Sequence, residues 1–423
     1  MKNQLFRAFS EKPFLLLWVG EVFTQISFNL LTFFLILHIF KLTNSNTAVS
    51  LVVLAFTIPS ILFGILAGVY VDRWNKKTVL LASNIIRGFL LILLAIFPDN
   101  IPAIYIIAFM VSIVTQFFIP AETPMIPLIV RNSNLLSANA LFGLGIYGSV
   151  LLAYLLSGPV IKIFGTANTL VFLSGLFFAG AFFISWIKIE KVVLPQKRGI
   201  LRESKKAMME EARLAFDFMR KSKVITSSLF LLALSQILLL VLAVLAPGYA
   251  TQILKISVED FPLIFIAPAA LGVFVGAIVL VNLFHNASRE KTMTVGLFLS
   301  GFAMFLLPFG SKIAARDIVQ SINIHLPSFL DITTLHLLTF MAFILGLANA
   351  FVFVPSNTIL QEETSDEFRG KVYGVLNAMV GIFSLLPIIL VGSLSDVIGV
   401  DKVIIGIGVV LLSLGVSRIL FDL

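Results

Sequence analysis

Long apolar stretches, separated by short polar segments, fill almost the whole chain of 423 residues. Stretches of about 20 apolar residues match the length of a helix that crosses the hydrocarbon core of a membrane. The strands of a membrane barrel would instead alternate apolar and polar residues over about ten positions, and the sequence shows no such alternation. The pattern therefore predicts an all-helical protein that crosses a membrane many times.

Twelve membrane-spanning helices can be placed along the chain. The predicted spans cover residues 14–40, 48–71, 78–97, 101–120, 138–160, 168–189, 224–249, 260–284, 292–309, 333–356, 372–395 and 402–421. Segment 190–223 is the one long polar interruption, and it separates six spans from six. We therefore expect two six-helix bundles, residues 1–189 and 224–423, joined by a linker.

The linker at 190–223 carries ten basic and five acidic residues. Its middle part reads as an amphipathic helix, which would lie on the inner leaflet and attract anionic lipid headgroups. We favour a simple tether between the two bundles. A regulatory, lipid-sensing element is the alternative.

Weak repeats relate the two halves to each other. Pro120 in the fourth predicted span has a counterpart in Pro355, which lies 235 positions later in the tenth. Gly158 and Gly165 correspond in the same way to Gly392 and Gly399, each 234 positions later. A nearly constant offset is the expected trace of a duplicated bundle, so we expect two pseudo-symmetric halves.

The distribution of charge defines the orientation of the chain. Only 12% of residues are charged, and the mean hydropathy is +1.05, whereas a soluble domain would carry about 25% charged residues. Most of the 30 Lys and Arg residues fall in segments on one side of the predicted membrane. Positive charge marks the cytoplasmic side of a membrane, so both termini should lie inside. The net charge of +8 is thus explained by topology and does not indicate binding to nucleic acid. The absence of cysteine excludes disulfides and thiol chemistry.

A short charged turn lies between the second and third spans. The turn resembles the signature loop of the major facilitator superfamily, G-x-L-a-D-r-x-G-r-k. The residues that match this motif are Gly68, Asp72, Arg73, Lys76 and Lys77. Tyr70 and Asn75 replace the usual Leu and second Gly. Because Asn tolerates a left-handed backbone better than other non-Gly residues, we expect Asn75 to preserve a tight turn.

A second motif narrows this resemblance. The segments Phe118–Val130 and Leu135–Leu141 are similar to the fourth and fifth helices of the third drug–proton antiporter family. That family includes macrolide-efflux-like exporters, siderophore exporters and lysophospholipid flippases. The resemblance implies the major facilitator fold, transport by alternating access, a location in the bacterial cytoplasmic membrane, and a central cavity lined by helices 1, 4, 7 and 10.

Few ionisable side chains fall inside the predicted spans, where each costs at least about 2.5 kcal/mol to insert. Glu21 in the first span and Arg87 in the third lie at similar depths above the inner face, so their side chains should meet. In one interpretation Glu21 is a proton carrier whose occupancy changes as the transporter opens and closes. In the other, Glu21 and Arg87 form a permanent ion pair.

A polar stripe should face the central cavity. On the first helix Gln25, Asn29 and Thr32 continue the face of Glu21, and in lipid such a stripe must face protein or water. The cavity residues that we expect are Glu21, Gln25, Asn29, Thr32, Ser112, Gln116, Gln236 and Asn349. An apolar, Phe-rich wall with these few polar groups suits a hydrophobic or amphipathic substrate.

The signature loop should form part of an inner gate. The resemblance implies that Asp72 faces the start of helix 11 near Gly370–Tyr373, with Arg369 in the adjoining loop, and we expect Arg73 to pair with Glu122. The alternative is that only Asp72 contributes. Gly158 and Pro159 partly match the antiporter motif of the fifth helix and favour export. The full set of expected gating residues is Gly68, Asp72, Arg73, Lys76, Lys77, Glu122, Gly158, Pro159 and Arg369.

These observations predict a secondary active transporter, with proton-coupled efflux of hydrophobic or amphipathic compounds as the leading hypothesis. A lysophospholipid flippase on the same fold is the first alternative, and a membrane scaffold or enzyme is the second. The chain has neither a phosphate-binding glycine loop nor histidines at ligand spacing, so we expect no cofactor, no metal and no catalytic residues. Its partners should be a lipophilic substrate, protons and membrane lipids, and we expect a monomer.

Overall fold

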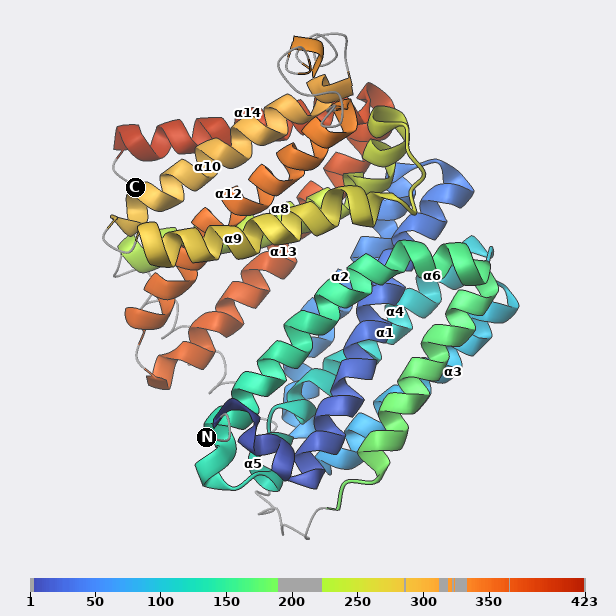
Figure 1. Ribbon diagram of the computed structural model, residues 1–423. Helices are drawn as coiled ribbons and strands as arrows, with labels where there is room; N and C mark the ends of the chain where they lie inside the picture. Colours follow the sequence, from blue (N-terminus) through green and yellow to red (C-terminus); the bar gives the residue numbers. More distant parts are fainter. Residues whose placement is uncertain are drawn as a thin grey trace. The chain divides into compact units, whose positions relative to one another are not determined.

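The computed structural model describes residues 4–188, 223–284, 287–311, 319–321, 323, 333–364 and 366–421 (Figure 1). Apart from Lys223, the predicted linker 190–223 lies outside the described residues. The described part of the chain is helical and contains no strand.

The apolar stretches form the predicted helices, with boundaries within a few residues of those expected at most ends. Eleven elements are long and apolar enough to cross a membrane among the described residues. One of them, α6, has 51 residues and contains a break at Gly165, so it supplies two spans. The major helices are α1 (Lys12–Thr43), α2 (Asn46–Val71), α3 (Lys76–Ile96), α4 (Ile101–Glu122), α6 (Leu135–Ser185), α8 (Lys223–Gly248), α9 (Ala267–Leu283), α10 (Arg289–Leu306), α12 (Thr334–Glu362), α13 (Asp366–Ile398) and α14 (Val400–Phe421).

Short helical turns cap or extend these helices. They are η1 (Gln4–Ser10), α5 (Met125–Ile129), η2 (Asn132–Asn134), the π-helical turns η3 (Tyr249–Leu254) and η4 (Pro262–Ile266), and η5 (Leu307–Ser311). With the two halves of α6 counted separately, the described ranges supply the twelve membrane-spanning helices expected from the sequence. The predicted fold class is confirmed.

The chain divides into two compact units. Unit 1 contains Met1–Asn44 and Leu51–Arg198, and unit 2 contains Ser45–Ser50 and Gly199–Leu423. The first turn of α2 therefore groups with unit 2, where the carboxylate of Asp396 accepts hydrogen bonds from the backbone N–H groups of Asn46 (2.7 Å) and Thr47 (2.9 Å). A carboxylate at this position satisfies donors that the helix start leaves unpaired.

In unit 1, α1 packs mainly against α6, which also packs against α3. At Gly145 of α6 an added Cβ would lie only 2.6 Å from Nε1 of Trp18, whose indole donates a 2.8 Å hydrogen bond to the carbonyl of Leu141. A small residue is therefore needed where the two helices approach. In unit 2, α12 packs against α8, α9 and α10.

The sequence repeat reappears in the backbone. Gly165 and Gly399 are the two glycines with positive φ among the described residues, at 69° and 98°. Each lies between two consecutive spans: the two halves of α6 in unit 1, and α13 and α14 in unit 2. Pro120 and Pro355 likewise lie inside α4 and α12. The two units thus make equivalent turns at positions that the sequence offset relates.

Replacing Gly165 with alanine should destabilise the protein. Its φ of 69° and ψ of −174° fall in a region that is essentially restricted to glycine, so a side chain there costs about 1–3 kcal/mol. No atom lies within 4 Å of the added Cβ, so the effect isolates backbone strain. The apparent unfolding temperature of purified Gly165→Ala in detergent should therefore fall.

The matched control is Gly148→Ala in the same helix. Its added Cβ also meets nothing within 4 Å, but its φ is not positive. Alanine should leave stability unchanged or raise it by up to about 1 kcal/mol. Equal unfolding temperatures for the two variants would contradict the strain at Gly165.

Candidate functional site

A ladder of polar side chains runs along α1 in unit 1. The carboxyl group of Glu21, which is 1% exposed, accepts a 2.7 Å hydrogen bond at Oε1 from Nε2 of Gln25. Asn29 donates through Nδ2 to the backbone carbonyl of Gln25 at 2.8 Å. The polar stripe expected from the sequence therefore exists as a connected set of hydrogen bonds, with an acid at one end.

Arg87 of α3 lies in the interior of the same unit and is also 1% exposed. Its guanidinium donates to Oδ1 of Asn84 at 2.8 Å, to the carbonyl of Ser83 at 3.2 Å and to Oγ1 of Thr115 at 3.4 Å. Asn84 in turn donates through Nδ2 to Oγ1 of Thr24 on α1 at 3.0 Å. These bonds connect α1, α3 and α4 and fix the orientation of the cation.

Two aromatic rings form the apolar walls around the Arg87 guanidinium. Its central carbon lies 4.4 Å from the ring centroid of Phe118 on α4 and 4.8 Å from that of Phe177 on α6. A cation over an aromatic face is stabilised, most of all where water is excluded. The positive charge is thus held in place without a direct ion pair.

Glu122, the last residue of α4, brings a second carboxyl group into this region. It is 6% exposed, and its side chain lies within hydrogen-bond reach of Glu21, with Arg87 close enough to interact electrostatically with both. Oε2 of Glu21 and Oε2 of Glu122 are buried and find no donor among the described residues. The expected pairing of Glu122 with Arg73 is wrong, because Arg73 is exposed whereas Glu122 points into the interior.

Glu21 and Arg87 are brought together as predicted, but not in direct contact. Among the described residues, Arg289 and Glu362 form an ion pair. His38 lies 3.1 Å from Asp99, a contact that is an ion pair only when the imidazole is protonated. Three ionisable groups from α1, α3 and α4 therefore share one buried region, which we call the Glu21–Glu122–Arg87 cluster. Such a cluster can hold a proton away from water and release it when water enters.

The remaining predicted cavity residues of unit 1 are engaged locally. Ser112 donates a 2.7 Å hydrogen bond to the carbonyl of Phe56 on α2, so its hydroxyl connects two helices. Gln116 donates to the carbonyl of Ser112 at 3.3 Å. Thr32 donates to the carbonyl of Phe28 at 2.9 Å. Ser112 and Thr32 therefore already satisfy their hydroxyl donors within unit 1.

In unit 2, Asn349 of α12 donates through Nδ2 to Oγ of Ser235 on α8 at 2.8 Å. The neighbouring Gln236 is half-buried. That these residues line one cavity together with those of unit 1 stays a prediction.

The two lysines of the signature loop donate hydrogen bonds to backbone carbonyls at the ends of neighbouring helices. Nζ of Lys76 donates to the carbonyls of Val71 (2.6 Å) and Asp72 (2.9 Å), and so satisfies the C-terminal end of α2. Nζ of Lys77 donates to the carbonyls of Ser185 and Ile187, each at 2.7 Å, at the end of α6. Lysines are favourable at helix C-termini. Both lysines therefore have local structural bonds within unit 1.

The tight turn expected before Asn75 is present, but the left-handed backbone expected for Asn75 is wrong. Its φ is −67° and its ψ is 114°, an extended conformation, and its side chain accepts a 3.1 Å hydrogen bond from the backbone N–H of Thr78. Asn75 is thus the N-cap of α3, a role in which Asn is strongly preferred. The replacement of glycine here is compatible with the fold because of capping, not because of a left-handed turn.

The other predicted gating residues lie in or next to the expected helices, but their roles in a gate stay predictions. Asp72 is exposed and Gly68 is half-buried, at the end of α2. Gly158 and Pro159 lie inside α6. The backbone of Arg369 belongs to α13, while its side chain is outside the described part of the structure.

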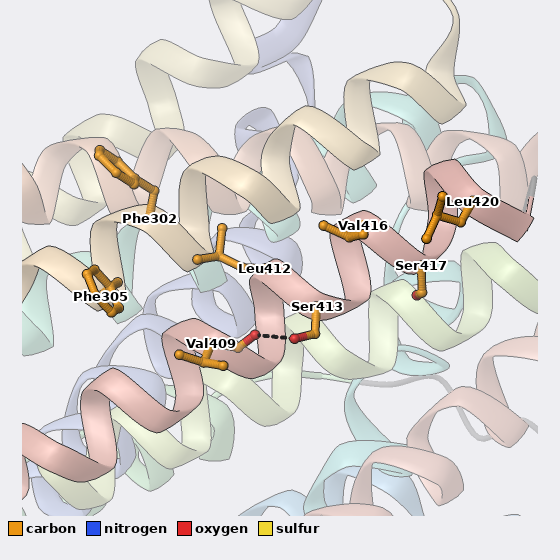
Figure 2. Close-up of a pocket in the computed structure, with 8 residues that line it drawn as sticks. All are labelled: Phe302, Phe305, Val409, Leu412, Ser413, Val416, Ser417 and Leu420. Atoms are coloured by element: carbon orange, nitrogen blue, oxygen red, sulfur yellow. Dashed lines mark hydrogen bonds between the residues drawn. The ribbon is translucent and has the colours of Figure 1, made fainter.

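An apolar groove of about 600 Å³ lies between α10 and α14 in unit 2 (Figure 2). Phe302 and Phe305 come from α10, and Val409, Leu412 and Val416 come from α14. None of the predicted cavity residues lines it. Within the described part of the chain, no three His, Asp or Glu side chains gather closely enough to hold a metal ion.

The fold, a set of apolar membrane-length helices with a small buried polar cluster, defines a multi-pass membrane protein. The family model described as Major Facilitator Superfamily matches residues 17–387. The chain belongs to this superfamily. It is therefore a membrane transporter and not an enzyme.

Individual relatives are distant. The uncharacterised MFS-type transporter YfiS of Bacillus subtilis is 21% identical over 91% of this chain and 87% of its own length. Macrolide efflux protein A of Streptococcus pyogenes is 22% identical over 92% of this chain and 90% of its own length. Export is thus documented in the name of one relative.

Solved structures resemble the chain in fold. A bacterial homologue of the human lysosomal transporter Spinster, inward-facing and unoccupied, has a TM-score of 0.70 at 14% identity and covers 96% of each chain. The nucleoside transporter NupG has a TM-score of 0.68 at 15% identity, covering 96% of this chain and 99% of its own. At these identities the resemblance concerns the fold alone.

Removing the cation from the cluster should destabilise the protein. Arg87→Met leaves two buried carboxyl groups without a counter-charge, a change that typically costs about 3–5 kcal/mol. The apparent unfolding temperature at mildly alkaline pH, where carboxyl groups tend to ionise, should fall strongly.

The matched double variant Arg87→Met with Glu122→Gln also removes one negative charge. It should recover part of the lost stability, since neighbouring charges in one network are not additive. A double variant less stable than Arg87→Met alone would contradict a shared electrostatic cluster.

Proposed function

We propose that the protein is a proton-coupled exporter of hydrophobic or amphipathic small molecules that works by alternating access. One observation carries this proposal: a carboxyl group, Glu21, lies buried inside a membrane-spanning bundle close to the buried cation Arg87. Ionisable groups in such a place are costly and mark ion or proton pathways. Because Arg87 is held by Asn84 and by two aromatic rings instead of by Glu21, the acid is free to change its protonation state.

The proposed substrate class rests on the character of the helices. The chain contains 41 Phe residues, and the polar groups proposed to line the cavity are mostly neutral amides and hydroxyls. Recognition of a sugar phosphate or nucleotide would call for clustered Arg or Lys side chains. A relative named for macrolide efflux is compatible with a bulky lipophilic cargo.

The proposed setting is the bacterial cytoplasmic membrane, with both termini on the inner side and the protein acting as a monomer. The basic signature loop lies on the same side.

An inner gate completes the proposed cycle. In the proposed closed gate, Asp72 would face the start of α13 near Gly370–Tyr373, because a helix N-terminus favours a negative charge. Gly158 and Pro159 lie at the helix face that closes toward the outside during export. The breaking and forming of such contacts would convert one state into the other.

Glu21→Gln should abolish proton-driven transport while leaving substrate binding largely intact, since Gln keeps the shape of Glu but carries no proton to exchange. The measurement is accumulation of a fluorescent lipophilic cation in reconstituted vesicles with an imposed pH gradient, alongside equilibrium binding of the same dye. Uptake by Glu21→Gln that still follows the gradient would refute the role of Glu21.

The control for this experiment is Glu290→Gln. Glu290 is an exposed residue in the first turn of α10, so this variant should transport normally. Parallel vesicles offered fluorescent lysophospholipid test the alternative, because a lysophospholipid flippase would move the lipid and not the dye.

Asp72→Asn should reduce transport without reducing expression or the unfolding temperature. The carboxylate is exposed at the end of α2, so its loss affects unit 1 little, whereas a capping charge is lost from the gate. Initial transport rates normalised to the amount of purified protein test this expectation. Normal rates in Asp72→Asn would remove Asp72 from the gate.

A further inference from the structure

We propose that Glu21 and Glu122 hold a single proton between them and that this shared proton is the one exchanged during transport. The inference rests on the proposed function and deepens it, because it makes Glu122 a second proton-coupling residue. From the sequence alone, Glu122 was expected to belong to the gate.

The first argument is geometric. The two carboxyl groups lie within hydrogen-bond reach, one from the first third of α1 and one from the end of α4. Both Oε2 atoms are buried without a donor among the described residues. Two carboxylate oxygens can only accept hydrogen bonds, and a buried acceptor without a donor is costly, the more so if it is charged. A proton between the two groups would satisfy both atoms at once.

The second argument is the balance of charge. Arg87 brings one positive charge, and two ionised carboxyl groups would bring two negative charges. All three side chains are at most 6% exposed, so water cannot screen the excess. With one proton on the carboxyl pair the cluster is neutral. A net charge in this place would be costly.

No other charged group among the described neighbours alters this count. The described residues that hydrogen-bond to Glu21 or Arg87, or that place a ring beside Arg87, are neutral. They are Gln25, Ser83, Asn84, Thr115, Phe118 and Phe177. Arg87 is thus the charged partner that faces both acids.

The third argument comes from the repeat. Pro120 of α4 corresponds to Pro355 of α12, so the counterpart of Glu122 is Asn357. The side-chain oxygen of Asn357 accepts a hydrogen bond from the hydroxyl of Tyr373. The second unit therefore has a neutral, satisfied amide at the place where the first has an acid. The buried pair is a departure from the shared architecture.

Release of the proton follows from the same balance. When the cluster is occluded, loss of the proton would leave one uncompensated negative charge. When water reaches the pair, the proton can pass to water and the remaining carboxylate charge is hydrated. On the opposite side of the cycle a proton taken from water restores neutrality before the site closes.

The experiment counts protonated buried carboxyl groups by infrared difference spectroscopy of the carboxyl C=O stretch in purified protein at neutral pH. The wild type should show one such group. Glu122→Gln and Glu21→Gln should each lose this signal entirely, because the remaining carboxylate then balances Arg87 and accepts a bond from the new amide. The exposed control Glu290→Gln should keep the signal, and every variant is checked for an intact unfolding transition.

A signal that survives in either single variant would overturn the proposal, since the proton would then belong to the remaining acid alone. If a variant fails to fold, Glu122→Asp keeps a carboxyl group and should retain the signal; loss of the signal in a folded Glu122→Asp protein would also overturn the proposal.

Transport separates this inference from the proposed function. Glu122→Gln should lose gradient-driven export, and the double variant with Glu21→Gln should be no worse than either single variant. Independent, additive losses would overturn sharing. A wild type that transports without any proton dependence would instead refute the proposed function, even with the shared proton present in the infrared spectrum.

Discussion

The requirement that a buried group of charges be neutral governs the interior of unit 1. Glu21, Glu122 and Arg87 come from three helices, and each would be costly to place alone among apolar side chains. Together they can coexist only if their charges balance and their helices hold a fixed spacing. The Asn84 bridge to Thr24 and the rings beside the guanidinium maintain that spacing.

Close helix packing makes this arrangement possible. An added Cβ at Gly180 of α6 would lie 2.7 Å from Oγ1 of Thr24, beside the same Asn84 bridge. A larger residue would push α6 away from α1 and open the cluster to lipid or water. On the other side, α5 and the end of α4 bury Phe118, Met125 and Ile126 in an apolar core next to Glu122. The polar cluster is therefore sealed by packing.

The sequence predicted the helices well because membrane spans have a strong length and hydropathy signal. The fold class, the spans and the proximity of Glu21 and Arg87 followed from that signal and from helix rise. The position of Glu122 did not, because it stands at the end of an apolar run, next to the loop where a partner in Arg73 was expected. The apolar residues Met125 and Ile126 that follow it closely were the available clue, since they belong to a second short helix, α5, and are themselves buried. Asn75 was misread because a glycine position was assumed to need positive φ, whereas this one needs an N-cap.

The single-residue turns at Gly165 and Gly399 determine how much of the chain is exposed to water between two membrane spans. At each of them one helix ends and the next begins with almost no loop between them. Each pair of spans should therefore enter the bilayer as a preformed hairpin. Neither turn presents a segment long enough for a protease to cut or an antibody to recognise. An inserted epitope tag would have to be placed in other connections, because at these two positions no loop residues are available to accommodate it.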